Sequence, residues 1–243
     1  MRKATPPTSG ADGRAAIDLA LPRRWPELTD GQLTYVLRLL AAGYQPGYTA
    51  SLLLLRLLPA GVSARDIPLM ELGAAADSLS WIGEPPREPA RPEGIGGGEA
   101  LDRELHGVPF ATWLAVENLW RGCIERGETG QGPKPPPVVA SLLDTLWPGY
   151  RPESYAPWHG LAALMWVNGL KESFAALFPH LYRPAGRGDG EPDARETMET
   201  QIRALTGGDV TKRPAVLETD TWAALTELDA KAREAAELRK YGN

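Results

Sequence analysis

Apolar residues recur at intervals of three and four along most of this chain, which is the spacing of amphipathic α-helices. The most aromatic stretch of this kind is 108–125. Pro109 suits its first turn, and Gly122 and Gly127 mark where the pattern weakens. One face carries Phe110, Trp113, Leu114, Glu117, Trp120 and Ile124, and Val116, Leu119 and Cys123 widen it. A face this wide predicts a core helix that is covered on two sides.

A capping box opens the first helix of the N-terminal region. Thr29 and Gln32 have the spacing at which each side chain can bond to the other's backbone N–H, and apolar positions then continue to about Gly43. Pro46 and Gly47 predict a turn. They lead into a second helix, with Thr49 or Ser51 as its cap.

The second helix contains the run Leu52, Leu53, Leu54, Leu55, Leu57 and Leu58, which only Arg56 interrupts. A helix that is apolar all round is typical of burial by several neighbours. Pro59 and Gly61 end it, and residues 67–82 predict a third helix.

Two segments rich in proline and glycine flank the central helix. The segment 83–98, GEPPREPARPEGIGGG, sustains neither helix nor central strand and predicts a linker or a long surface loop. No Lys, Ser or Thr follows Gly96, Gly97 and Gly98, and no strand precedes them, so they favour a flexible linker over a phosphate loop. The segment 127–137 favours extended polyproline structure.

Beyond this second break, residues 138–147 predict a short helix and 157–178 a long one that packs against the central helix. The core face expected for the long helix consists of Leu161, Leu164, Met165, Val167, Leu170, Phe174 and Leu177.

The C-terminal block predicts a helix at about 194–205, a stop at Gly207 and Gly208, and a long helix from about 219 to 240. Pairs four residues apart, Glu227 with Lys231 and Asp229 with Arg233, support the last helix. Its stripe contains Trp222, Leu225, Leu228, Ala232, Ala235 and Leu238. This narrow seam suits a partner helix or self-association, and the alternative is that Trp222 and Leu225 close the core of their own subunit.

No period-two strand pattern occurs, so the expected class is all-α: an irregular array of short helical blocks joined by Pro/Gly-rich linkers, with a long C-terminal helix. The expected organisation is a disordered arm (1–20), an N-terminal helical subdomain (21–82), a Pro/Gly-rich linker (83–100), a central helical core (101–183), a polar linker (184–193) and a C-terminal helical block (194–243).

The net charge of −5 argues against nucleic-acid binding, which usually shows as a basic excess. Cys123 is the only cysteine, so no internal disulfide can form. No apolar run is long enough for a signal peptide or a membrane span. We therefore expect a soluble protein in the cytoplasm.

Candidate chemistry is sparse. His106, His159 and His180 fit no metal-ligand spacing, and Cys123 lies within an apolar stripe, where a thiol is usually inert. An enzyme site built from His106, His159 and carboxylates is the weakest hypothesis. We predict no catalytic residue, cofactor or metal.

A helix-turn-helix spacing at 52–72 is the alternative from the nucleic-acid class. Gly61, Val62 and Ser63 would form its turn. Pro68 falls within the second helix and Arg65 is that helix's single basic residue, so a buried helical hairpin is the preferred interpretation.

Three stretches resemble poorly characterised proteins that bacteriophages and prophages encode in or near tail-gene clusters. They are LPRRWPELTDGQLTYVLRLL at 21–40, the central LHGVPFATWLAVENL, and QIRALTGGDVTKRPAVLETDTWAALTELDAK at 201–231. The resemblance implies a non-enzymatic protein of tail assembly, similar to an assembly chaperone, or a minor structural component. Its partners would be tail or other virion assembly proteins, in the bacterial cytoplasm or in the virion. The expected contact residues are Trp222, Leu225, Leu228, Ala232 and Ala235.

Overall fold

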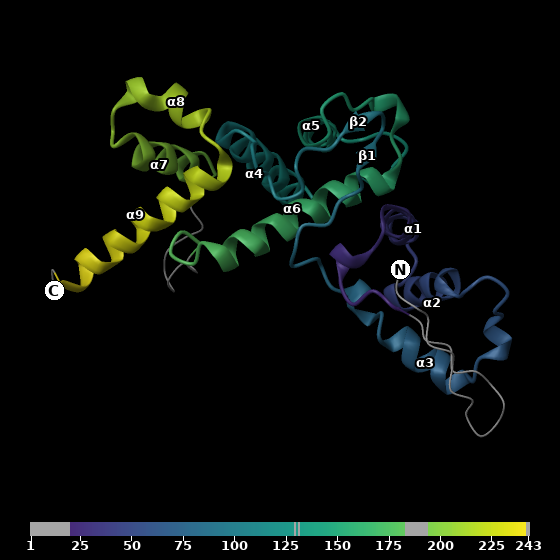
Figure 1. Ribbon diagram of the computed structural model, residues 1–243. Coiled ribbons are helices and arrows are strands. Elements are labelled where there is room, and N and C mark those ends of the chain that lie inside the picture. Colours follow the sequence, from purple (N-terminus) through teal and green to yellow (C-terminus); the bar gives the residue numbers. More distant parts are fainter. Residues whose placement is uncertain (1–19, 129, 131, 183–193, 242–243) are drawn as a thin grey trace, which may run out of the picture.

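The computed structural model describes residues 20–128, 130, 132–182 and 194–241. Over these residues the protein is mostly α-helical, which confirms the predicted all-α class (Figure 1). The predicted N-terminal arm, apart from Ala20, and the predicted polar linker at 184–193 lie outside the described residues.

The α-helices within the described residues are α1 (Asp30–Ala41), α2 (Pro46–Leu57), α3 (Leu69–Asp77), α4 (Phe110–Glu125), α5 (Pro137–Leu146), α6 (Pro157–Leu177), α7 (Ala194–Thr206), α8 (Arg213–Leu217) and α9 (Thr221–Tyr241). Short 3-10 helices lie at Trp25–Glu27, Ala64–Asp66, Ser80–Gly83, Pro152–Ser154 and Val210–Lys212. The short strands β1 (Gly94–Ile95) and β2 (Gly98–Glu99) form an antiparallel hairpin.

The predicted capping box fixes the start of α1. Thr29 Oγ1 accepts the backbone N–H of Gln32 at 3.4 Å, and Gln32 Oε1 accepts that of Thr29 at 2.9 Å. In contrast, the predicted turn at Pro46 is the first turn of α2, where a proline loses no hydrogen bond. Neither proposed cap of α2 acts as one: Thr49 is buried within the helix, and the Ser51 hydroxyl donates to the Gly47 carbonyl.

The second and third predicted helices need correction. In α2, Leu53 and Leu54 are buried but Leu55 is 49% exposed, because the neighbouring helices cover only part of its circumference. Only Leu69–Asp77 of the predicted 67–82 helix is α-helical. Pro68 restricts the residue before it to extended backbone, so the helix begins after the proline.

The segment 83–100 packs into the fold, which corrects the prediction of a linker or long surface loop. Ile95 is almost completely buried. The side chain of Trp147 donates to the Pro92 carbonyl at 3.3 Å, and that of Asn168 donates to the Pro86 carbonyl at 3.1 Å. Side chains of the central helices therefore satisfy carbonyls that have no partner in a regular sheet.

The triple glycine of this segment forms a tight hairpin turn, which corrects the prediction of a flexible linker. Gly96 and Gly97 have φ angles of 60° and 84°, the left-handed values that a two-residue turn of this kind requires. A Cβ at Gly98 would lie 2.4 Å from the Trp147 carbonyl oxygen. Two-residue strands have no recognisable period, so the sequence pattern missed them.

One continuous hydrophobic core joins the N-terminal and central helices. Within it, Trp113 of α4 meets Phe174 of α6 edge to face with 5.1 Å between ring centroids. Trp147 and Trp166 make a similar contact at 5.1 Å. Trp166 was absent from the predicted core face of α6, whereas the predicted Leu177 is 53% exposed because it lies at the helix end.

The central helix α4 begins one residue after Pro109, which is its N-cap residue and not part of its first turn. The expected core position Ile124 is 54% exposed, while Val116 and Cys123 are buried. The buried face of α4 therefore includes Val116 and Cys123 instead of Ile124, because α4 packs on α5 as well as on α6.

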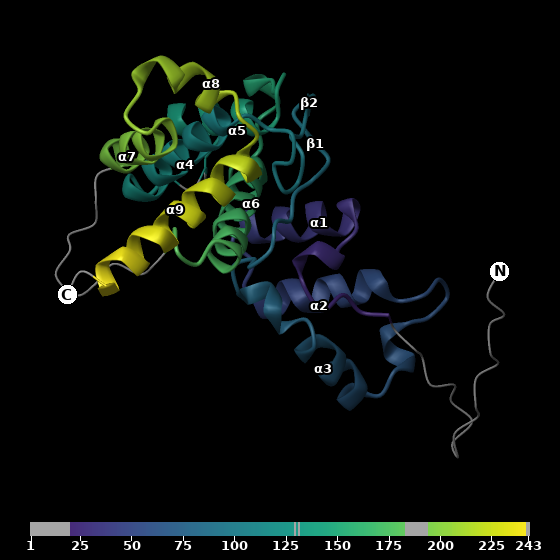
Figure 2. The same cartoon turned by 60° about the vertical axis from the view of Figure 1, so that its left-hand side comes forward.

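The C-terminal block is tied to the start of α4 through backbone pairing. Phe110 N–H donates to the Thr219 carbonyl at 2.8 Å, and Thr221 N–H donates to the Val108 carbonyl at 2.9 Å. As predicted, Gly207 and Gly208 end α7, with φ angles of 64° and 86°. The two backbone hydrogen bonds hold the start of α9 against the start of α4, and α7 also contacts α4 (Figures 1 and 2).

Candidate functional site

The first half of α9 closes the core of its own subunit. Leu225 and Leu228 are buried, and Trp222 contacts Phe174 edge to face with 5.6 Å between ring centroids. The Trp222 indole N–H donates to the Glu104 carbonyl at 2.7 Å. Leu225 and Leu228 are therefore not available as a partner surface, and the alternative that they close the core of their own subunit holds for them, while Trp222 is half-buried.

The second half of α9 is accessible. Ala232 is half-buried, Ala235 is exposed and Leu238 is 74% exposed. Figures 1 and 2 show this end of the helix leaving the helical body. A partner contact at Ala232 and Ala235 therefore stays a prediction.

One of the two predicted charge pairs on α9 has a different role. Glu227 and Lys231 form the expected ion pair at 3.1 Å. The Asp229 carboxylate instead accepts the backbone N–H groups of His180 and Leu181, at 2.7 and 2.9 Å. Burial opposes its charge, but these hydrogen bonds outweigh that effect and hold the pKa of Asp229 below its ordinary value.

The three histidines are held in separate structural contacts. His106 is exposed and stacks on Trp222 with 4.6 Å between ring centroids. His180 Nδ1 lies 3.1 Å from Asp229. His159 is buried, and its Nδ1 lies 3.2 Å from the Tyr150 hydroxyl.

Burial of His159 lowers its pKa from 6.5 to about 4, and the Arg38 cation adds to the effect. Burial also raises the pKa of the Cys123 thiol to about 11, so the reactive thiolate is disfavoured at neutral pH. Among the described residues, no three His, Cys, Asp or Glu side chains are grouped so that they could hold a metal ion.

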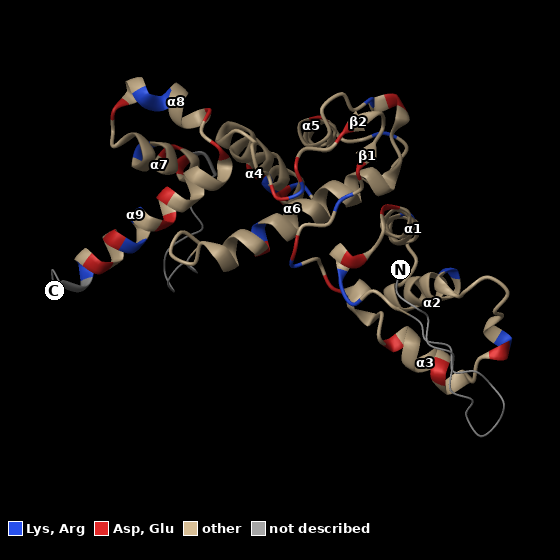
Figure 3. Ribbon diagram, in the orientation of Figure 1, with Lys and Arg blue, Asp and Glu red and all other residues tan. Residues whose placement is uncertain are grey.

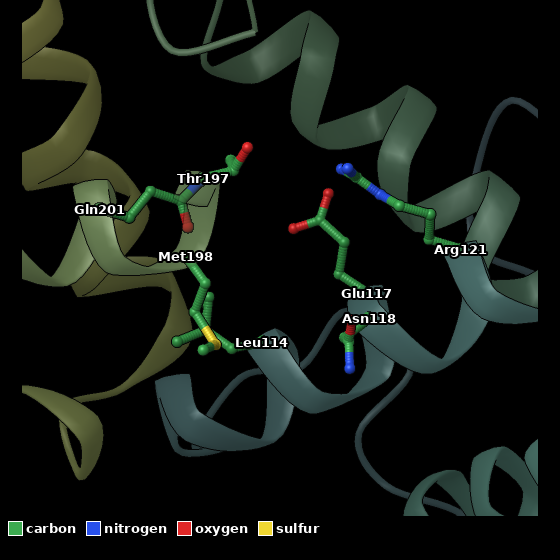
Figure 4. Close-up of a pocket in the computed structure, with 7 residues that line it drawn as sticks. All are labelled: Leu114, Glu117, Asn118, Arg121, Thr197, Met198 and Gln201. Atoms are coloured by element: carbon green, nitrogen blue, oxygen red, sulfur yellow. The ribbon is translucent and has the colours of Figure 1, made fainter. Parts of the chain in front are cut away.

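A pocket of about 250 Å³ lies between α4 and α7. Leu114, Glu117, Asn118 and Arg121 of α4 line one side, and Thr197, Met198 and Gln201 of α7 line the other (Figure 4). Glu117 forms an ion pair with Lys171 of α6 at 2.8 Å, and the Lys171 ammonium lies 4.8 Å from the centre of the Trp120 ring. The pocket therefore combines apolar walls, two carboxamides and a carboxylate that already has a cationic partner.

The most exposed large apolar side chains on a described helix lie on α3. Leu69 is 84% and Met70 is 88% exposed, and the exposed Gly73 and Ala74 follow them one turn later. We call these four residues the α3 face. Leu72, on the other side of the helix, packs against the core. The preferred interpretation of 52–72 as a buried helical hairpin is therefore wrong for Leu69 and Met70, which are exposed.

The charges on α3 argue against the helix-turn-helix alternative. Its sequence, LMELGAAAD, contains Glu71 and Asp77 and no Lys or Arg (Figure 3). A recognition helix needs cationic or amide side chains to meet phosphates and base edges. Ser63, in the expected turn, accepts the N–H of Arg65 and caps a 3-10 helix.

No helix in the described part of the chain is long and apolar enough to cross a membrane. Comparisons of the chain with protein-family models, with curated proteins and with solved structures find no match.

Proposed function

We propose that this is a non-enzymatic phage or prophage protein that acts through protein contacts in tail assembly, or as a minor structural component of the particle. The α3 face is the observation that carries the proposal. A row of exposed Leu, Met, Gly and Ala on one side of a helix is typical of a docking surface. Met70 suits such a surface because its flexible side chain adapts to different partners.

Burial of the α3 face would supply part of the binding free energy of a specific contact. Burial of a Leu or Met side chain contributes about 1.5 to 3 kcal/mol, so Leu69 and Met70 together would contribute roughly 3 to 6 kcal/mol. A micromolar complex requires about 8 kcal/mol. The α3 face would therefore supply a large part of such a binding free energy.

The charges around the α3 face indicate the chemistry of the partner. Glu71 and Asp77 lie on the same helix, which has no basic residue, and the chain has a net charge of −5. An apolar patch with a basic rim would complement this surface. The resemblance of 21–40, of the central LHGVPFATWLAVENL and of 201–231 to proteins from tail-gene clusters supports a tail or other virion assembly protein as that partner.

The test is binding to the purified tail proteins that are encoded beside the gene of this chain. We expect the wild-type protein to retain one of them and Met70→Glu to lose it. Val210→Glu is the matched control, because Val210 is also a highly exposed apolar residue but lies after α7. Failure of the wild type to bind any of these proteins would contradict the role in tail assembly. Equal binding by Met70→Glu and wild type would contradict the α3 face as the contact surface.

A further inference from the structure

The pocket between α4 and α7 contains a buried acceptor that no described residue satisfies. Gln201 is 9% exposed, and its Oε1 accepts no hydrogen bond within the described part of the protein. Buried polar atoms are normally paired, so an unpaired one in the wall of a pocket points to a ligand that supplies the donor. Figure 4 shows the Gln201 carboxamide on the α7 side of this space.

The other walls limit the charge of that ligand. Glu117 and Arg121 lie opposite Gln201, and Lys171 contacts Glu117 from α6 (Figure 4). An added carboxylate would bring no N–H donor to the Gln201 oxygen. An added ammonium group would be close to two cations. A neutral group with an N–H supplies the donor and avoids the repulsion from the two cations.

We propose that the α4–α7 pocket binds a small uncharged amide that carries a short aliphatic chain. An amide has an N–H donor and a C=O acceptor in one plane, and it can pair with the carboxamide of Gln201 through both. Asn118 offers a second carboxamide from α4. Leu114 and Met198 provide the apolar surface for the aliphatic chain.

The dimensions fit a ligand of this class. The pocket volume of about 250 Å³ equals roughly eight water molecules in the liquid, which is enough for a capped single amino acid. The terminal torsion of a glutamine side chain is soft, so the Gln201 amide can turn its oxygen toward a bound donor. The α4–α7 pocket and the α3 face are separate surfaces, so ligand binding in the pocket is independent of a contact at α3.

The probe for the test is N-acetyl-leucinamide, followed through the methionine methyl signals in NMR. The chain has only four methionines, and Met198 lines the pocket while Met70 lies on α3. We expect a saturable shift of the Met198 signal and none of the Met70 signal. N-acetyl-leucine, which differs by one carboxylate, should bind on the order of ten-fold more weakly.

Variants distinguish a loss of ligand binding in the pocket from a general loss of folding. Gln201→Leu replaces the unpaired carboxamide by an apolar group of similar size, so it should keep the thermal midpoint at or above that of wild type and lose the Met198 shift. Thr200→Ala, an exposed position of α7 outside this pocket, should keep the shift. If Gln201→Leu does not fold, Asn118→Ala, at an exposed position of α4, takes its place with the same expected loss of the shift. The proposal would be overturned if N-acetyl-leucinamide does not shift the Met198 signal, if N-acetyl-leucine binds equally well, or if the pocket variant binds N-acetyl-leucinamide as wild type does.

Discussion

The carbonyl oxygen of Glu88 lies so close to Gly169 of α6 that a Cβ at position 169 would be 2.4 Å away from it. The neighbouring Asn168 donates its side-chain N–H to the Pro86 carbonyl. A glycine in the middle of a long helix thus allows a proline-rich segment to cross that helix at backbone distance. The contact joins the segment 83–100 to the central core.

Replacement of Gly169 by alanine should therefore destabilise the protein. The added methyl group would meet backbone atoms, which cannot move as a flexible side chain can, and overpacking of this kind costs about 1 to 3 kcal/mol. The measurement is the free energy of unfolding in denaturant.

Gly73→Ala is the matched control for this substitution. Gly73 lies within α3, and no neighbouring atom lies within 4 Å of the Cβ position. Alanine there should stabilise the helix by about 0.5 to 1 kcal/mol. A Gly169→Ala protein as stable as wild type would show that the segment 83–100 does not hold its position on α6.

Acid should weaken the fold through His159. The ordinary pKa of a histidine is 6.5, and burial, which disfavours the charged ring, lowers the pKa of His159 to about 4 in the folded protein. The unfolded chain therefore binds a proton at a higher pH than the folded protein. The stabilisation is complete above pH 6.5 and is lost as the pH falls toward 4, with a loss of about 2 kcal/mol between pH 7 and pH 5.

Denaturant unfolding of wild type and of His159→Gln at pH 7 and pH 5 tests this effect. The variant should show a smaller difference between the two pH values than wild type by about 2 kcal/mol. His106→Gln, at the exposed histidine beside Trp222, should keep the full pH dependence. An equally steep dependence in His159→Gln would exclude His159 as the source.

Substitutions along α9 should separate core from surface. Leu225→Ala removes a buried side chain and should cost about 2 to 5 kcal/mol. Leu238→Ala, at a position that is 74% exposed, should change the stability by less than about 0.5 kcal/mol. Thermal unfolding measures both. Similar effects at the two positions would contradict the arrangement in which only the first half of α9 is docked.

Helix positions could largely be predicted from the sequence, because capping residues and apolar periods act locally. The Thr29 capping box and the stop at Gly207 are examples. Local composition does not predict structure where tertiary contacts override it. The segment 83–100 looked like a linker, yet hydrogen bonds from Trp147 and Asn168 order it.

The candidate sites were harder to predict for a related reason. Apolar spacing on a helix shows that a face is apolar, and it does not show whether other helices cover that face. Leu225 of α9 was expected at a partner surface and is buried, whereas Met70 lies in the segment that was expected to be a buried helical hairpin and is exposed. The α4–α7 pocket depends on Asn118 and Gln201, which are far apart in the sequence and match no motif.

Hydrogen exchange of the protein with and without its purified tail partner tests whether the α3 face is the contact surface. We expect the partner to slow exchange of the backbone amides of α3, Leu69–Asp77. Protection of the second half of α9 with no change in α3 would place the contact on α9 and contradict the proposed role of the α3 face.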